Sequence, residues 1–255
     1  MLVVSAGMQK SGSAYIYNVI NDIMEAAGNS DARQIKSRYK LDHVMKQYNN
    51  SIALSYSNLL RLASIARREG SFAVKTHQRP NVLLRLMLAL GQVKVIYVYR
   101  DPRDVMLSAM DHGKRIIERG EKHGFAQMTD FDSALNNVRR WCIVGRSYWR
   151  LRGAISVSYE QLMHHPLDVV GRLMDYLGLK VDAVVVKAIL DRYSRDHVSD
   201  PDLRSALHLN KAETDRYVRE MTGEQTKRVN AELGWFIEEA GYSLGAFGGS
   251  EPGRG

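Results

Sequence analysis

The sequence predicts an α/β fold: a three-layer sandwich with a central parallel sheet and a helical C-terminal third. Short apolar runs alternate with helical patterns over the first 160 residues, which is the βαβ signature of a parallel sheet with helices on both faces. The last third shows helical periodicity alone. A length of 255 residues suits one α/β domain. We therefore expect a single domain over residues 1–244 and a disordered, glycine-rich tail over residues 245–255.

The strands are expected at residues 2–6, 71–75, 93–99 and 154–158. Each is a short apolar run of the kind that is buried on both faces. The run 93–99 is the clearest, because it is β-branched and aromatic and is apolar on both faces apart from Lys94. That pattern is typical of the centre of a parallel sheet.

The helices are expected between and after these strands. The first covers residues 13–27, where apolar residues recur every fourth position, and ends at Gly28. Asp101 and Pro102 open another, as N-cap and first helical residue. Residues 31–50 and 113–130 are polar and basic and are expected as irregular surface segments. The remaining helices are expected at residues 56–68, 81–90, 131–150, 166–177, 182–193, 213–221 and 223–240.

Composition narrows the class of protein. Apolar residues make up 45% and charged residues 25%, as in ordinary soluble globular proteins, which excludes global disorder, collagen and coiled coil. Lys and Arg total 36 against 28 Asp and Glu, a formal charge of +8. Such an excess favours an anionic partner: a phosphorylated ligand, an acidic substrate, nucleic acid or a membrane surface.

The single cysteine, Cys142, excludes an internal disulfide and a cysteine-rich metal site. We expect it to be a buried small hydrophobe, and we expect the compartment to be the reducing cytoplasm. The histidines are scattered without metal-ligand spacing, so no metal site is expected. The N-terminal apolar run is too short for a signal peptide, and no later run has the length of a membrane span.

The first motif, Gly-Met-Gln-Lys-Ser-Gly-Ser-Ala-Tyr at residues 7–15, joins the first strand to the first helix. A helix N-terminus with a glycine-bearing turn and a lysine forms a P-loop-like cradle for anions. A Walker A loop would place lysine directly after the glycine. Here Ser13 follows Gly12, and Lys10 precedes it by two residues. The loop thus suits phosphate-like groups but is not that of an ordinary ATPase or GTPase.

The second motif is Lys75-Thr76-His77, at the end of a predicted strand. Residues two apart in a strand face the same side. Lys75 and His77 should therefore project together at the carboxyl end of the sheet, where α/β folds bind ligands. A histidine at this position can remove a proton from a hydroxyl near neutral pH. The alternative is a structural histidine.

Two further segments supply candidate nucleotide contacts. Arg100 follows the central strand, and Ser108 lies two turns into the next helix. An arginine fork and a hydroxyl suit a phosphate monoester; the alternative for Arg100 is a surface ion pair. Tyr159 closes the last predicted strand, where it can stack on a nucleotide base or serve as a core aromatic.

In this order, these segments resemble the family of sulfotransferases that use 3′-phosphoadenosine-5′-phosphosulfate (PAPS). The family's loop Pro-Lys-Ser-Gly-Thr-Thr-Trp is similar to residues 9–15, and its Lys-Thr-His, in the cytosolic small-molecule form, matches residues 75–77. Its Arg and Ser eight residues apart match Arg100 and Ser108, and its Tyr-Glu-Asp-Leu is similar to residues 159–162. The resemblance covers about residues 2–180.

The resemblance implies in-line transfer of a sulfuryl group from PAPS to an acceptor hydroxyl without a metal. It implies that Lys10 stabilises the leaving phosphate and that His77 is the general base, with Lys75 as the third catalytic candidate. Tyr15 takes the place of the tryptophan that contacts adenine. The cofactor-binding residues it implies are Gln9, Lys10, Ser11, Gly12, Ser13, Ala14, Tyr15, Arg100, Ser108, Tyr159 and Lys211.

The chain departs from the family pattern at three places. Ala14 replaces a threonine and so lacks one hydroxyl contact. The family's C-terminal Arg-Lys-Gly clamp on the 3′-phosphate has no clean match; Lys211 is our choice among Arg204, His208, Asn210 and Lys211. The dimerisation motif of animal members is not visible, which leaves monomer and homodimer both open.

Two other functions compete. A P-loop-like nucleotide kinase or phosphotransferase would need Mg²⁺ and a carboxylate near the loop, and the missing Walker lysine counts against it. A nucleic-acid-binding module would explain the charge, but the sequence has no interleaved aromatic and basic stripe. The histidine base favours a small-molecule acceptor, such as a natural product or phenol. The residues that contact this acceptor are expected within residues 31–57, 78–86 and 111–130.

Overall fold

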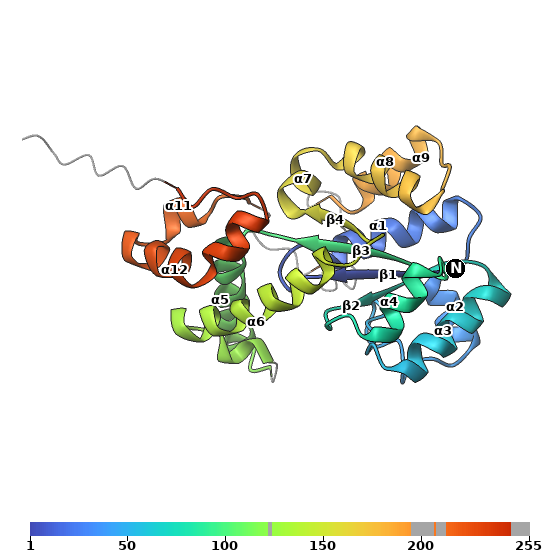
Figure 1. Ribbon diagram of the computed structural model, residues 1–255, viewed down its shortest axis with the longest axis horizontal. Coiled ribbons are helices and arrows are strands. Elements are labelled where there is room, and N and C mark those ends of the chain that lie inside the picture. The colour runs from blue at the N-terminus through green and yellow to red at the C-terminus, as the bar shows by residue number, and fades with distance from the viewer. Residues whose placement is uncertain (122–123, 195–206, 208–212, 246–255) are drawn as a thin grey trace, which may run out of the picture. The chain divides into compact units, whose positions relative to one another are not determined.

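The computed structural model describes residues 1–121, 124–194, 207 and 213–245 (Figure 1). The chain forms two compact units, which are treated separately. The first comprises Met1–Arg100 and Ile143–Ala212, and the second Asp101–Cys142 and Glu213–Gly255. A single domain over residues 1–244 stays a prediction, and the tail expected at residues 245–255 lies outside the described residues from 246 onward.

The first unit is built on a four-stranded parallel sheet of order β2-β1-β3-β4. The strands are β1 (Leu2–Gly7), β2 (Phe72–Thr76), β3 (Val93–Tyr99) and β4 (Ile155–Ser158). The predicted fold class and all four predicted strands are confirmed. Because every strand runs the same way, their carboxyl ends share one edge of the sheet.

Helices cover both faces of this sheet. They are α1 (Ser13–Ala26), α2 (Ala32–Arg38), α3 (Tyr56–Glu69), α4 (Val82–Ala89), α7 (Tyr159–His164), α8 (Pro166–Leu177) and α9 (Ala183–Arg192). α1 and α8 bury Ile20 and Leu173 against Val3 and Ile96 of one face. α3 and α4 pack on the other face (Figure 1). Burial on both faces explains why these strands are continuously apolar.

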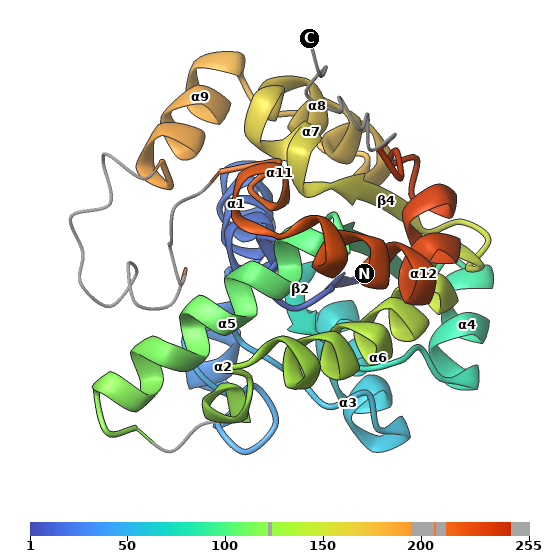
Figure 2. The ribbon, with the colours of Figure 1, turned by 90° about the vertical axis from the view of Figure 1, so that its left-hand side faces the viewer.

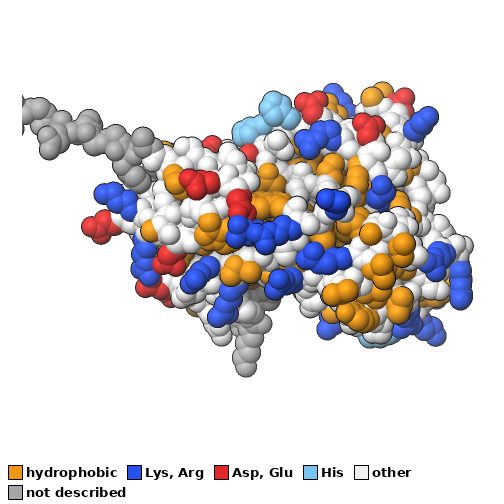
Figure 3. Space-filling model, viewed as in Figure 1, with side chains coloured by type: hydrophobic (Ala, Val, Ile, Leu, Met, Phe, Trp, Pro, Cys, Tyr) orange, Lys and Arg blue, Asp and Glu red, His pale blue; other side chains and the backbone are white. Residues whose placement is uncertain are grey.

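The outer sides of α3 and α4 carry exposed apolar side chains, visible as orange atoms over these helices in Figure 3. They are Tyr56, Leu60, Val82, Leu86 and Leu90. Lys and Arg side chains are widespread on the same face of the molecule, in keeping with the charge of +8 (Figure 3).

The second unit is helical (Figure 2). It contains α5 (Pro102–Glu118), a 3₁₀ turn (Gly124–Gln127), α11 (Tyr217–Glu220), α12 (Gly223–Glu239) and the first part of α6 (Phe131–Trp149). Asp101 caps α5 and forms a buried 2.6 Å ion pair with Arg103. Cys142 is fully buried, as expected, and burial raises the pKa of its thiol.

Some expected elements differ from those in the structure. α2 lies in a segment expected to be irregular, because the Asp31 side chain caps it. α5 continues to Glu118 rather than ending near residue 112, since Gly113 lets Phe125 and Met128 pack against the helix. In the segment 213–221 only Tyr217–Glu220 is helical. In the described part of the chain, no helix is long and apolar enough to cross a bilayer.

Candidate active site

The turn between β1 and α1 is tightly constrained. A Cβ at Gly7 would lie 2.6 Å from the Cβ of Ser13 and 2.8 Å from a side-chain carbon of Val98, so only glycine fits at this position. Lys10 and Gly12 both have left-handed backbones, with φ of 63° and 77°. Such a conformation costs glycine little and costs lysine about 1 kcal/mol or more. The structure thus holds Lys10 in a strained position within the loop.

The loop is closed by main-chain contacts. The amide of Met8 donates to Val98 O at 2.9 Å. The hydroxyl of Ser11 lies 2.5 Å from Met8 O and 3.2 Å from Val98 O, and its side chain is buried. Ser11 therefore uses its hydroxyl to hold the loop on β3.

The loop ends at the N-terminus of α1. Gly12 occupies the N-cap and supplies no side-chain cap, and the first turn holds no acidic residue. The first amides of a helix have no partner within the helix, and the helix dipole places partial positive charge there. This end of α1 is therefore suited to an anion.

Arg100 and Tyr159 join the loop from two other strands. Arg100 follows β3, and its Nη1 donates to Lys10 O at 3.4 Å. Its guanidinium lies 4.2 Å from the centre of the Tyr159 ring. A Cβ at Gly12 would meet that ring at 3.0 Å. Tyr159 is the first residue of α7 rather than the last of a strand, because Ser158 caps the helix by accepting from the Gln161 amide.

His77 binds the base of the same loop. Its Nδ1 lies 2.7 Å from Gly7 O, and its Nε2 lies 2.9 Å from Lys75 Nζ. A carbonyl oxygen only accepts, so Nδ1 carries a proton and donates it. In the neutral imidazole, Nε2 then holds the lone pair. Sequence reasoning placed Lys75 and His77 on one side but had no signal for the carbonyl that selects the tautomer.

Lys75 is buried, and burial lowers the pKa of its ammonium from 10.5 to about 8. Its backbone is fixed by a neighbouring segment: the amide donates to Asn50 O at 3.2 Å, and its carbonyl accepts from the Ile52 amide at 2.8 Å. The polar pair Asn49-Asn50 is the one sequence signal of a turn next to Lys75, and the sequence analysis did not predict this contact. A lysine with a pKa near 8 is readily available as a donor or as a proton carrier.

An aromatic pair fixes the chain after His77. Tyr148 donates its hydroxyl to Gln78 O at 2.7 Å, and its ring stacks on Tyr97 with centroids 4.8 Å apart. Burial raises the pKa of the Tyr148 hydroxyl, which keeps it protonated and donating. Neither aromatic residue was singled out from the sequence.

The remaining predicted residues are placed as follows. Gln9 is partly exposed on the loop, while Ser13 and Ala14 are buried in the first turn of α1. Tyr15 is half-buried, and its ring meets the Tyr193 ring edge-on at 6.4 Å. Burial and the nearby Asp191 carboxylate raise the pKa of the Tyr15 hydroxyl to about 12.

Two predicted residues lie outside the described part of the first unit. Ser108 is a buried residue of α5 in the second unit. Lys211 lies outside the described residues. Among the residues that the structure describes, no group of three or more His, Cys, Asp and Glu side chains is arranged to hold a metal ion.

Comparison with known proteins gives a family. The sulfotransferase domain model matches residues 2–233. A luciferin sulfotransferase of Photinus pyralis is 27% identical over 132 residues. That match spans 49% of this chain and 35% of the relative, so the chain is matched to about a third of that protein's length.

Solved structures give the same fold. A retinol dehydratase in complex with androsterone and the inactive cofactor PAP has a TM-score of 0.61 at 17% identity, covering 93% of this chain and 81% of its own. A mouse sulfotransferase complexed with PAP has a TM-score of 0.62 at 14% identity, covering 94% and 85%. A sulfotransferase domain from the curacin biosynthetic pathway has a TM-score of 0.54 at 12% identity, covering 96% and 98%. The loop, the Lys-Thr-His motif and the domain match agree, and the chain belongs to the sulfotransferase domain family.

Proposed function

We propose that this protein transfers the sulfuryl group of PAPS to the hydroxyl of a small-molecule acceptor. One observation carries the proposal: four segments far apart in the sequence meet at the carboxyl edge of the sheet. They bring the α1 N-terminus, the Arg100 guanidinium, the Tyr159 ring and a histidine of defined tautomer to one glycine-bearing loop. Cations, a helix end and a proton acceptor are what a phosphosulfate and a hydroxyl require together.

Binding of PAPS is assigned to the loop and to two flanking side chains. The amides at the start of α1 and the Lys10 ammonium hold the 5′-phosphosulfate. Arg100 binds the 3′-phosphate, because its guanidinium is already oriented by the Tyr159 ring and by Lys10 O. Tyr159 and Tyr15 contact the adenine. Ser108 and Lys211 stay candidate contacts to the 3′-phosphate.

The chemistry follows from the tautomer of His77. The acceptor hydroxyl gives its proton to Nε2, while its oxygen forms a bond to sulfur in line with the bridging oxygen of PAPS. The bond between sulfur and that oxygen breaks, and its electron pair leaves on the phosphate of adenosine 3′,5′-bisphosphate. Lys10 and the α1 amides stabilise this charge. In the structure the Lys75 ammonium, 2.9 Å away, donates to the Nε2 lone pair. The proposed reaction therefore requires the acceptor hydroxyl to displace Lys75 from Nε2, and Lys75 then to turn toward the sulfuryl oxygens.

The kinase alternative is not favoured, since the family match is to sulfotransferases. We also propose that the protein is cytoplasmic, that the reaction needs no metal, and that the acceptor is a small molecule. The oligomeric state is left open.

Calorimetric titration with adenosine 3′,5′-bisphosphate, without metal, tests the proposal. We expect micromolar binding to the wild type, weakened at least about tenfold in Lys10→Ala and Arg100→Ala, since charge-assisted contacts are worth about 1.5–3 kcal/mol each. Lys94→Ala is the matched control, because Lys94 lies at the start of β3 with its Nζ over the Tyr176 ring. No binding to the wild type, together with Mg²⁺-dependent binding of ATP, would overturn the proposal in favour of a phosphotransferase.

A further inference from the structure

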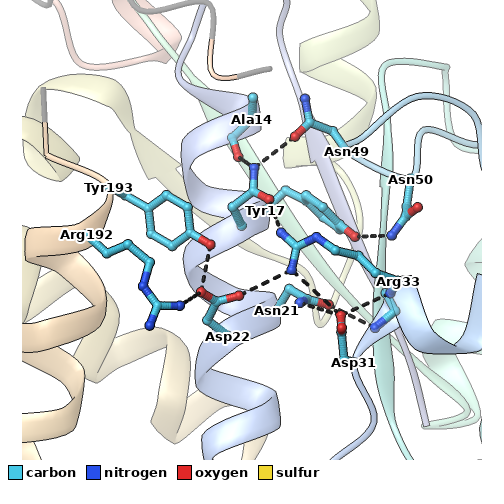
Figure 4. Close-up of polar contacts among 12 residues, drawn as sticks. Ala14, Tyr17, Asn21, Asp22, Asp31, Arg33, Asn49, Asn50, Arg192 and Tyr193 are labelled. Atoms are coloured by element: carbon cyan, nitrogen blue, oxygen red, sulfur yellow. Dashed lines mark hydrogen bonds and ion pairs between the residues drawn. The ribbon is translucent and has the colours of Figure 1, made fainter. Parts of the chain in front are cut away.

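The middle turns of α1 carry polar side chains that the proposed reaction does not use (Figure 4). Asn18 is fully buried, and Asp22 is 8% exposed. Asp22 lies seven residues after Tyr15, so the two share a face of the helix. A buried carboxylate is costly unless it is paired and hydrogen-bonded, and its partners therefore show what it does.

Asp22 holds the end of α9. Its Oδ2 accepts from the Tyr193 hydroxyl at 2.6 Å and pairs with Arg192 Nη1 at 3.0 Å. Its Oδ1 faces Arg33 Nη1 of α2 at 3.4 Å (Figure 4). Burial and the bond to the Asp22 carboxylate raise the pKa of the Tyr193 hydroxyl, so it stays protonated and donates.

Tyr193 in turn supports Tyr15. Tyr193 is 3% exposed and packs in the apolar cluster that joins α1 to α9, with Val19 and Leu190 among its members. Its ring meets the Tyr15 ring at 80° with the centroids 6.4 Å apart. Tyr15 is only half-buried. The orientation of Tyr15 therefore depends on a neighbour whose own position is fixed at its far end by Asp22.

We propose that Tyr193 and Asp22 are positioning residues that orient Tyr15 and thereby set the affinity for the adenosine part of the cofactor. The inference rests on the proposed function, because it needs Tyr15 to contact that group. Neither residue is assigned a contact with the cofactor. The pair acts through one aromatic contact and one hydrogen bond, across a sequence separation of 171 residues.

Removal of one hydroxyl tests the pair. We expect Tyr193→Phe to weaken binding of adenosine 3′,5′-bisphosphate about three- to tenfold by calorimetry, since the ring stays but its anchor is lost. Asp22→Asn should have a similar effect. Tyr176→Phe is the matched control, because its hydroxyl donates to the Gly153 carbonyl at 2.7 Å within the same unit. It should lower the melting temperature without changing the affinity.

A double-mutant cycle separates positioning from direct contact. In a Tyr15→Ala background, Tyr193→Phe should have no further effect on the affinity, because the side chain through which it acts is gone. An equal loss in both backgrounds would show that Tyr193 acts independently of Tyr15 and would overturn the inference.

The two proposals fail in distinguishable ways. A wild type that does not bind adenosine 3′,5′-bisphosphate overturns the proposed function and the inference with it. A wild type that binds, with Tyr193→Phe and Tyr176→Phe both at wild-type affinity, overturns the inference alone.

Discussion

The first turn of α1 and its middle turns bury polar groups in opposite ways. At the N-terminus, Gly12 supplies no side-chain cap, and the amides of the first turn are aligned with the positive end of the dipole. Two turns further on, the Asp22 carboxylate is paired with Arg33, Arg192 and Tyr193. The comparison separates polar groups that are open to a ligand from those that are paired within the fold. Substitutions at the N-terminal end should act directly on binding and transfer, whereas substitutions of Asp22 should lower stability and weaken cofactor binding only indirectly, through Tyr193 and Tyr15.

The largest effect is expected at the loop end. His77→Ala should lower the rate of sulfuryl transfer by about 10²–10⁴-fold, the range of a general base. His43→Ala, at an exposed histidine bonded to Arg61, is the control. The measurement is single-turnover transfer from PAPS. A His77→Ala enzyme with the wild-type rate would show that this histidine is structural.

Next is the middle of the helix. Asp22→Ala leaves the buried Tyr193 hydroxyl without its acceptor and removes the ion pairs to Arg192 and Arg33, although Arg33 keeps its bond to Asn18 Oδ1. It should lower the free energy of unfolding by about 2–3 kcal/mol. Asp42→Ala, which breaks only an exposed pair with Lys36, should cost less than about 1 kcal/mol. Urea denaturation of both variants measures the difference. Equal losses in the two variants would show that the buried pairing of Asp22 contributes no more to stability than an exposed ion pair.

Lys75→Met should separate activity from stability. The folded pKa of Lys75 is about 8 and its ordinary value is 10.5, so the unfolded chain binds more protons between these values and the wild type gains stability as pH rises through that window. At pH 7 this pKa shift corresponds to a destabilisation of the wild type by about 3 kcal/mol. Replacing Lys75 by Met removes this cost, but it also removes the bond to His77, which contributes about 1 kcal/mol.

The Lys75→Met variant should therefore be about 2 kcal/mol more stable than wild type at pH 7 and should lose the gain between pH 8 and 10.5, while transfer slows. Denaturation at pH 7 and at pH 10 checks both statements. A variant less stable than wild type at pH 7 would show that Lys75 contributes more by its contacts than it costs by its burial.

The smallest effect concerns Gly12. An alanine here would adopt a φ of 77° and place its Cβ 3.0 Å from the Tyr159 ring. We expect a loss of about 1–2 kcal/mol in stability and weaker binding of adenosine 3′,5′-bisphosphate, because Tyr159 must move. Gly28→Ala has the same backbone strain with φ of 80° and open space around its Cβ, so it isolates the contribution of the ring.

Local pattern was enough to predict most of the fold. The four strands and the motifs at their ends follow from short apolar runs and from the rule that parallel strands end at one edge. The helix α2 was missed because its buried positions, Ala32 and Ile35, are too few to set a period. α5 was predicted too short because Gly113, a helix breaker by propensity, is there to admit two carbonyls.

Candidate site residues could be chosen from the sequence, and their roles stay predictions; the contacts among them could not be predicted. Lys75, His77, Arg100 and Tyr159 were identified from their places at strand ends. Their partners are set by packing between distant segments: Gly7 O with His77, Lys10 O with Arg100, and Asn50 O with Lys75. Every residue type carries the same backbone carbonyl, so no sequence motif could have predicted these partners.

The tautomer of His77 is selected by an oxygen that every residue type carries. Replacing Gly7 by alanine keeps that oxygen and instead drives a methyl group into Ser13 and Val98. A survey of side-chain substitutions will therefore score position 7 as a packing defect, although the same residue sets which nitrogen of His77 can receive a proton. A change to the main chain, in which an ester replaces the Met8 amide, weakens the Gly7 carbonyl as an acceptor without adding a methyl group; it also removes the bond from the Met8 amide to Val98 O, so its effect on the loop must be measured beside its effect on His77.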